Sequence, residues 1–217
     1  MAHPDDPEMF CGGTIALLTR RGLQVGYVLL TSGDKGSDDR TVTNQGLVQR
    51  REEEQRAAAA RLKVAEVVFL HHPDGELEDT PNIRREIVRE IRRFRPDLVI
   101  STDPARLYGR GVNHRDHRVA GILTLDAVYP SARNHRYFPD LLSEGWEPHA
   151  VKEVWLAGPH EPDLEFNIDA VYEDRVAAIA CHRSQIGDLD KFYQRMKENR
   201  EKQAGPMTEK FKRLIFG

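Results

Sequence analysis

Cysteine and long apolar runs are both scarce in this sequence. The 217 residues include two cysteines, Cys11 and Cys181, too few and too far apart for a disulfide framework or a zinc-finger spacing. This usage is typical of a reducing compartment, so we predict a cytoplasmic protein. No apolar run is long enough to cross a bilayer and no signal-peptide pattern is present, so no membrane is expected among the partners.

A strong charge of either sign is also missing. Lysine and arginine number 32 and aspartate and glutamate 35, a net charge of −3. This balance gives no basis for nucleic acid or an anionic membrane as a partner. The sequence also lacks internal repeats and low-complexity segments. Its length suits one domain over residues 1–217, with a helical C-terminal part from about residue 169.

Short apolar runs alternate with helical patterns along the chain. Strands are predicted at 24–33, 65–70, 97–101 and 151–157, and helices at 12–22, 47–62, 81–95, 119–128 and over most of the chain after Asp169. Thr80-Pro81 is a typical helix start. The alternation predicts an α/β fold, a three-layer Rossmann-like sandwich with a mostly parallel, doubly wound sheet.

Polar loops follow the predicted strands, where ligands collect in such folds. Two of the polar clusters, HPDD (3–6) and HRDH (114–117), contain the residue types that bind metals. A catalytic zinc site uses about three imidazole or carboxylate ligands and leaves one position open. Either aspartate of HPDD can ligate a metal while the other acts as a base, and the two histidines of HRDH can divide their roles similarly. The competing interpretation is ordinary: surface histidines and helix-capping turns.

Taken together, six motifs resemble one known family. They are AHPDD-x-E with CGGT, RREEE with AAAARL, PDGEL, RPDLVIS, HRDH and CHRSQ. In this order they resemble the LmbE/PIG-L family of zinc-dependent de-N-acetylases over nearly the whole chain. Within the family the chain is most similar to the small bacterial sugar deacetylases of the bacillithiol-biosynthesis type.

The resemblance implies the metal ligands and the catalytic groups. It makes His3, Asp6 and His117 the ligands of Zn²⁺, with Fe²⁺ as an alternative metal because histidine and aspartate suit both ions. It makes Asp5 the general base that activates water. His114 would stabilise the oxyanion and protonate the leaving amine, with Asp116 orienting it.

The resemblance also implies substrate-binding residues. Arg51 would reach the sugar and Asp74 would bind its hydroxyl groups; the alternative for Arg51 is an ion pair on the helix surface. His182, in CHRSQ, has either a structural contact behind the site or a role in substrate binding. Family members have an apolar strand before HPDD. Only Met1 and Ala2 precede the motif here, so we expect a first strand that is missing or truncated.

The implied reaction is hydrolysis of the acetamide of an N-acetylglucosamine-type sugar or conjugate, which gives acetate and a free amine. The partner is therefore a small N-acetylated sugar. A homo-oligomer is compatible with the sequence, with the helical C-terminal part as a surface for assembly. Two alternatives stay open, a metal-dependent phosphoesterase and a non-catalytic sugar- or metal-binding protein.

Overall fold

The computed structural model describes residues 1–109 and 111–216, which form two compact units. One unit combines residues 75–164 with the C-terminal segment from Lys210, and the other combines residues 2–74 with 165–209. They are called the 75–164 unit and the 2–74 unit below. The single domain expected from the length stays a prediction. In the described part of the chain, no helix has both the length and the apolar character needed to cross a membrane.

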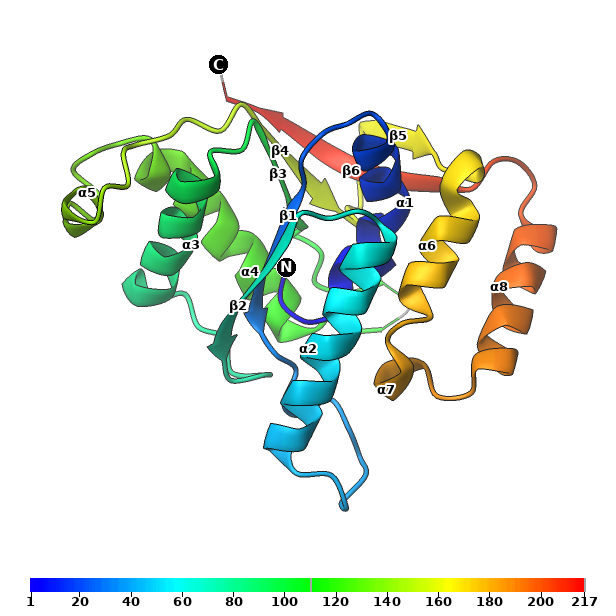
Figure 1. Cartoon of the computed structure of the whole chain (residues 1–217). Coiled ribbons are helices and arrows are strands. Elements are labelled where there is room, and N and C mark those ends of the chain that lie inside the picture. Colours follow the sequence, from blue (N-terminus) through cyan, green and yellow to red (C-terminus); the bar gives the residue numbers. More distant parts are fainter. Residues whose placement is uncertain (110, 217) are drawn as a thin grey trace. The chain divides into compact units, whose positions relative to one another are not determined.

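The 2–74 unit is built on two parallel strands joined by a helix. Strand β1 (Gly26–Thr31) pairs with β2 (Glu66–His72), and helix α2 (Asn44–Arg61) connects them (Figure 1). The Thr31 amide donates to the carbonyl of Ala2 at 2.9 Å. The residues just before HPDD are thereby held at the carboxyl end of β1, where ligands collect in parallel sheets.

Helix α1 (Asp6–Arg20) follows directly and is kinked at Cys11, whose φ is −148°. At the kink, the amides of Gly13 and Thr14 donate to the buried carboxylate of Glu209, at 2.9 and 2.7 Å. A Cβ at position 13 would lie 2.7 Å from Ile168, so the close packing there requires glycine. The CGGT motif therefore forms a helix restart capped by a carboxylate from far along the chain.

The rest of the 2–74 unit is helical. Its elements are η2 (Asp169–Val171), α6 (Tyr172–Ile179), α7 (Arg183–Ile186) and α8 (Leu189–Lys202). Helix α6 packs against both α1 and α2. This packing places the CHRSQ segment, which follows α6, next to the helices that carry HPDD-x-E and RREEE.

The 75–164 unit contains most of the second sheet. Strand β3 (Leu98–Thr102) is parallel to β4 (Glu153–Ala157), and β4 is antiparallel to β6 (Thr208–Ile215). With β5 (Leu164–Asn167) the strand order is β3-β4-β6-β5. Helices α3 (Pro81–Phe94) and α4 (Arg115–Asp126) pack together, and η1 (Ala127–Ala132) and α5 (Asp140–Ser143) follow α4.

The predicted α/β class is confirmed, and each predicted strand is present. Thr80 caps α3 as expected, its hydroxyl accepting from the Ile83 amide. Three helices start earlier than predicted: α1 at Asp6 rather than residue 12, α2 at Asn44 rather than residue 47, and α4 at Arg115 rather than residue 119. HRDH is therefore itself a helix start. The segment Thr208–Ile215 is a strand in a region predicted to be mostly helical, because pairing with β4 outweighs its local preferences.

Arg92 on α3 is the main polar group inside the 75–164 unit. Its side chain is only 1% exposed and donates to five backbone carbonyls, those of Ser131, Ala132, Asn134, Tyr137 and Phe138. Burial lowers the pKa of its guanidinium. One cation therefore fixes the whole turn from 131 to 138, because buried carbonyls need donors.

Replacing this cation should destabilise the protein far more than replacing its exposed neighbour. Arg92→Met leaves several buried carbonyls without a donor, and we expect a loss of about 3 kcal/mol or more in the free energy of unfolding. Arg89→Met, which removes a partly exposed ion pair with Glu90, should cost less than about 1 kcal/mol. Urea unfolding of both variants provides the comparison, and equal midpoints would contradict the role given to Arg92.

Candidate active site

The HPDD motif forms a tight turn that leads into α1. His3 and Asp6 are 7% and 4% exposed. One carboxylate oxygen of Asp6, Oδ2, accepts from the amides of Ala2 and His3, at 3.1 and 2.9 Å. Asp5 adopts φ 100° and ψ −30°, a conformation that is rare for residues other than glycine. Such a backbone costs about 1–3 kcal/mol and persists only where its surroundings enforce it.

The ring of His3 lies between two carboxylates. Its Nε2 is 3.0 Å from Oδ1 of Asp74, and its Nδ1 is 3.6 Å from Oδ2 of Asp6. Burial raises the pKa of Asp74, but the hydrogen bond and charge of His3, aided by the Lys35 amide and Arg51, lower it overall. Asp74 therefore acts as an acceptor for the Nε2 proton of His3. That tautomer directs the lone pair of Nδ1 towards the side of Asp6, as a metal ligand requires.

Asp5 lies beside these groups but has different partners. Its amide donates to Oε1 of Gln55 at 2.9 Å, and its carboxylate lies 3.6 Å from the guanidinium of Arg51. Burial and the nearby Asp6 carboxylate raise the pKa of Asp5 to about 6, against the opposing effects of Arg51, His182 and His3. A carboxylate with such a pKa suits proton transfer near neutral pH.

Arg51 is buried, so the alternative of an ion pair on the helix surface is wrong. Its side chain is 4% exposed and donates to the carbonyls of Pro4 and Gly33, at 2.6 and 3.2 Å. A Cβ at Gly33, whose φ is +66°, would lie 2.0 Å from the guanidinium. The loop after β1 therefore needs glycine at this position, and Arg51 ties that loop to the HPDD turn.

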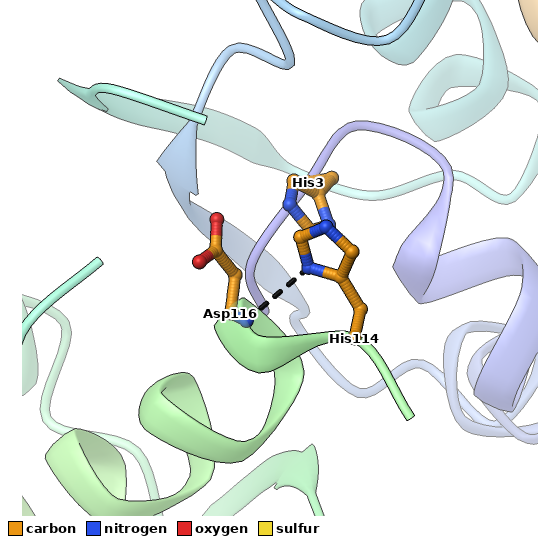
Figure 2. A group of neighbouring side chains, drawn as sticks. All are labelled: His3, His114 and Asp116. Atoms are coloured by element: carbon orange, nitrogen blue, oxygen red, sulfur yellow. Dashed lines mark hydrogen bonds between the residues drawn. The ribbon is translucent and has the colours of Figure 1, made fainter. Parts of the chain in front are cut away.

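The HRDH motif belongs to the 75–164 unit. His114 is the N-cap of α4, and its Nδ1 accepts from the Asp116 amide at 3.2 Å, a hydrogen bond drawn as a dashed line in Figure 2. Because Nδ1 is an acceptor, the proton of the neutral ring is on Nε2. His114 is also exposed, so its ring is accessible to a ligand.

The carboxylate of Asp116 accepts from the backbone of the PDGEL loop. Its two oxygens accept from the amides of Gly75 and Leu77, at 2.7 and 3.3 Å, and the residue is fully buried. Its backbone amide at the same time orients the ring of His114. The placement of the PDGEL loop and the orientation of His114 therefore depend on the same residue.

Asn113 is a site residue to which the sequence analysis gave no role. Its Nδ2 donates to the Arg106 carbonyl at 2.8 Å, which leaves Oδ1 facing Nδ1 of His117 at 3.2 Å. The Nδ1–H of His117 is then the donor, so Nε2 keeps its lone pair for a metal. The signal was present in the sequence, because an amide four residues before a histidine near a helix start can reach its ring.

These donors fit a divalent cation. In the 2–74 unit, His3 offers an imidazole nitrogen beside the carboxylate of Asp6, and in the 75–164 unit His117 offers a second nitrogen. The ring proton of His3 is on Nε2, facing Asp74, and that of His117 is on Nδ1, facing Asn113. The nitrogen that would bind the metal therefore carries no proton in either ring. Imidazole nitrogens and carboxylate oxygens are usual donors for Zn²⁺, and Fe²⁺ accepts the same types of ligand.

Comparison with known proteins identifies the family. Residues 1–128 match the GlcNAc-PI de-N-acetylase family, PIG-L. The chain belongs to this family. It is 38% identical over 184 residues to the diacetylchitobiose deacetylase of Thermococcus kodakarensis, an alignment that covers 85% of this chain and 67% of that protein.

Two further relatives agree with this assignment. A probable N-acetyl-alpha-D-glucosaminyl L-malate deacetylase 2 of Bacillus cereus is 29% identical over 193 residues, covering 84% of this chain and 80% of that one. The solved structure of N,N'-diacetylchitobiose deacetylase from Pyrococcus horikoshii matches with a TM-score of 0.88 and 28% identity, covering 98% of this chain and 81% of that chain. The resemblance inferred from the motifs is thus confirmed, and with it the enzyme class, hydrolases of N-acetyl amide bonds.

Removing the acceptor for His3 should weaken metal binding. In Asp74→Ala the Nε2 proton of His3 loses its partner, so both tautomers become accessible, and we expect the affinity for Zn²⁺ to fall about 10–100-fold. Glu76→Ala, a change at an exposed position of the same loop, should leave the affinity within twofold. Competition with a chromophoric chelator measures both. An unchanged affinity in Asp74→Ala would show that the tautomer is fixed elsewhere.

The same reasoning applies to His117 and its amide partner. Asn113→Ala removes the acceptor for Nδ1–H, so we expect a loss of about 10–100-fold in Zn²⁺ affinity. Asn82→Ala, at an exposed asparagine on α3 of the same unit, is the matched control. Titration calorimetry reports both affinities, and equal values for Asn113→Ala and the control would contradict the assignment.

Proposed function

We propose that this chain is a metal-dependent deacetylase of N-acetylglucosamine-type sugars, producing acetate and a free amine. The observation that carries the proposal is that HPDD and NHRDH each hold a histidine in the tautomer that a metal ligand needs, in a chain 38% identical to a diacetylchitobiose deacetylase. A phosphoesterase or a non-catalytic binding protein explains neither this relationship nor the presence of both a base and an acid. Within the class, we propose short N-acetylated chito-oligosaccharides as the first substrates to examine.

In the proposed site, His3, Asp6 and His117 bind the metal. The alternative set of ligands that we considered is His3, His114 and Asp116. We favour the first set because it leaves His114 available for proton transfer. When bound there, a divalent metal supplies Lewis acidity, which polarises the acetyl carbonyl and makes water a stronger acid.

The chain's own residues supply the proton transfers. Asp5 accepts a proton from water as the water oxygen attacks the acetyl carbon. His114 donates a hydrogen bond from Nε2 to the developing oxyanion. To act as the acid it first takes a second proton, on Nδ1, from solvent, so that transfer of the Nε2 proton to the departing nitrogen leaves a neutral ring and not an imidazolate. The C–N bond breaks, acetate and the amine leave, and the proton on Asp5 returns to solvent. Water and amide are thereby converted to acid and amine in balance.

For Arg51 and Asp74 we propose supporting roles next to the sugar. Arg51 holds the HPDD turn and the loop after β1, and Asp74 orients His3. Direct contacts with sugar hydroxyl groups are the further part of the proposal for both side chains. Two free cysteines, Cys11 and Cys181, support the proposed cytoplasmic location. A homo-oligomer stays a prediction.

Acetate release from defined sugars tests the function. The purified chain with Zn²⁺ should release acetate from N,N'-diacetylchitobiose, N-acetylglucosamine or its malate conjugate, and a chelator should abolish the release. Asp5→Asn should lower kcat about 10²–10⁴-fold and retain the metal, because Asp5 is not a proposed ligand. Asp38→Asn, at an exposed loop position, should retain wild-type kcat.

Two outcomes would reject the proposal. One is a folded, metal-loaded protein that releases no acetate from any of the three sugars. The other is acetate release that is unchanged in Asp5→Asn, since the reaction would then proceed without the proposed base.

A further inference from the structure

A chain of buried polar side chains lies beneath the HPDD turn in the 2–74 unit. Gln55 on α2 and Glu8 on α1 are fully buried, and His182, which follows α6, is 1% exposed. Nε2 of Gln55 donates to both carboxylate oxygens of Glu8 at 3.1 Å, and Nε2 of His182 lies 3.1 Å from Oε2 of Glu8. The chain ends at Asp5, whose amide donates to Oε1 of Gln55 at 2.9 Å.

The hydrogen bonds in this chain have one consistent direction. A carboxylate only accepts, so Glu8 must face the NH₂ group of Gln55, and the amide oxygen of Gln55 must then face Asp5. The Nδ1 of His182 is buried without a partner among the described residues, so its proton belongs on Nε2, where it is donated to Glu8. Glu8 and His182 thus fix which end of the Gln55 amide meets Asp5.

The residue at the end of the chain has the most unusual backbone of the turn. Asp5 has φ 100°, and hydrogen bonds to the peptide that precedes it hold it there. The amide of Asp5 is held by Gln55, and the preceding carbonyl, that of Pro4, is held by Arg51 at 2.6 Å. Rotation about φ of Asp5 would turn its carboxylate away, so the bond to Gln55 acts directly on the direction of that side chain.

We propose that Gln55, oriented by Glu8 and His182, is a positioning residue that fixes the backbone of Asp5 and thereby aims its carboxylate as the general base. The inference rests on the proposed function and assigns His182 its role as a contact behind the site. A purely structural role does not need this polarity, because packed apolar side chains stabilise a core at least as well as buried polar ones. Misplacing a catalytic group by about 1 Å can cost about 10²-fold in rate.

Exchanging the charges within the chain tests the proposal. Gln55→Glu places two buried carboxylates against each other and breaks the chain. The double variant Glu8→Gln/Gln55→Glu restores a hydrogen bond at each of the three contacts. Its new carboxylate at position 55 accepts from the Asp5 amide, and its new side-chain amide at position 8 donates to that carboxylate while accepting from His182.

Two further variants complete the set. Gln49→Glu, the same substitution at an exposed position of α2, is the matched control for the added charge. Gln55→Met, which buries no charge, replaces Gln55→Glu if that variant does not fold.

Three measurements on the metal-loaded proteins separate positioning from stability. They are kcat and KM on the sugar that the wild type deacetylates, Zn²⁺ content, and hydrogen exchange of the Asp5 amide by NMR. In Gln55→Glu or Gln55→Met we expect kcat to fall about 10²-fold, with KM and Zn²⁺ content within twofold and Asp5 exchange at least tenfold faster. The double variant should recover kcat to within fivefold and restore protection of the amide, and Gln49→Glu should match the wild type.

The proposal is overturned if the single variants keep kcat within twofold once folded and loaded, even with a lower Tm. It is also overturned if kcat falls while exchange of the Asp5 amide is unchanged, or if the double variant recovers protection but not kcat. Wild-type protein that releases no acetate rejects the proposed function. In that case hydrogen exchange of the Asp5 amide still tests whether Gln55 fixes the backbone of Asp5. Exchange that is faster in Gln55→Glu and slow again in the double variant supports this, and unchanged exchange rejects it.

Discussion

The left-handed backbone of Asp5 is the constraint on which the rest of the site depends. A residue other than glycine holds such a conformation only when its neighbours leave it no alternative. Here Gln55 accepts a hydrogen bond from the Asp5 amide, and Arg51 donates one to the Pro4 carbonyl. The carboxylate of Asp6 accepts from the amides of Ala2 and His3, earlier in the same turn. The turn separates two adjacent aspartates into a group that faces His3 and a group that faces Arg51. This separation allows one of them to bind a metal and the other to transfer protons.

Carboxylates that accept from distant backbone amides recur in both units. Asp116 holds the amides of the PDGEL loop, and Glu209 caps the restart of α1 at Gly13 and Thr14. Hydrogen bonds to a charged acceptor stabilise by about 1.5–3 kcal/mol each, more than neutral ones. A short loop held in this way keeps its shape without a core of its own. The motifs of the proposed site can therefore lie on loops and still be rigid.

The histidines show how the surroundings decide the role of a side chain. His3 donates its Nε2 proton to Asp74, and His117 donates its Nδ1 proton to Asn113. Each ring therefore has a second nitrogen without a proton, as a metal ligand requires. His114 accepts from the Asp116 amide on Nδ1 and carries its proton on Nε2, which suits a hydrogen bond to an oxyanion. His182 is enclosed and donates to Glu8. Four rings of the same chemistry thus acquire three roles, and in each case a hydrogen bond sets the tautomer.

The sequence by itself determined much of the local structure and indicated the residue types of the candidate site. The Thr80-Pro81 start of α3, the strands and the spacing of HPDD and HRDH follow from interactions within a few residues, and these motifs sufficed to indicate the family. Only the tertiary structure decided the strand at Thr208–Ile215, the burial of Arg51 and the chain from His182 to Asp5. Its bonds join residues 174, 47 and 50 positions apart. The physical reason is that local preferences act over one or two turns of chain, whereas such contacts exist only once whole helices and strands have packed.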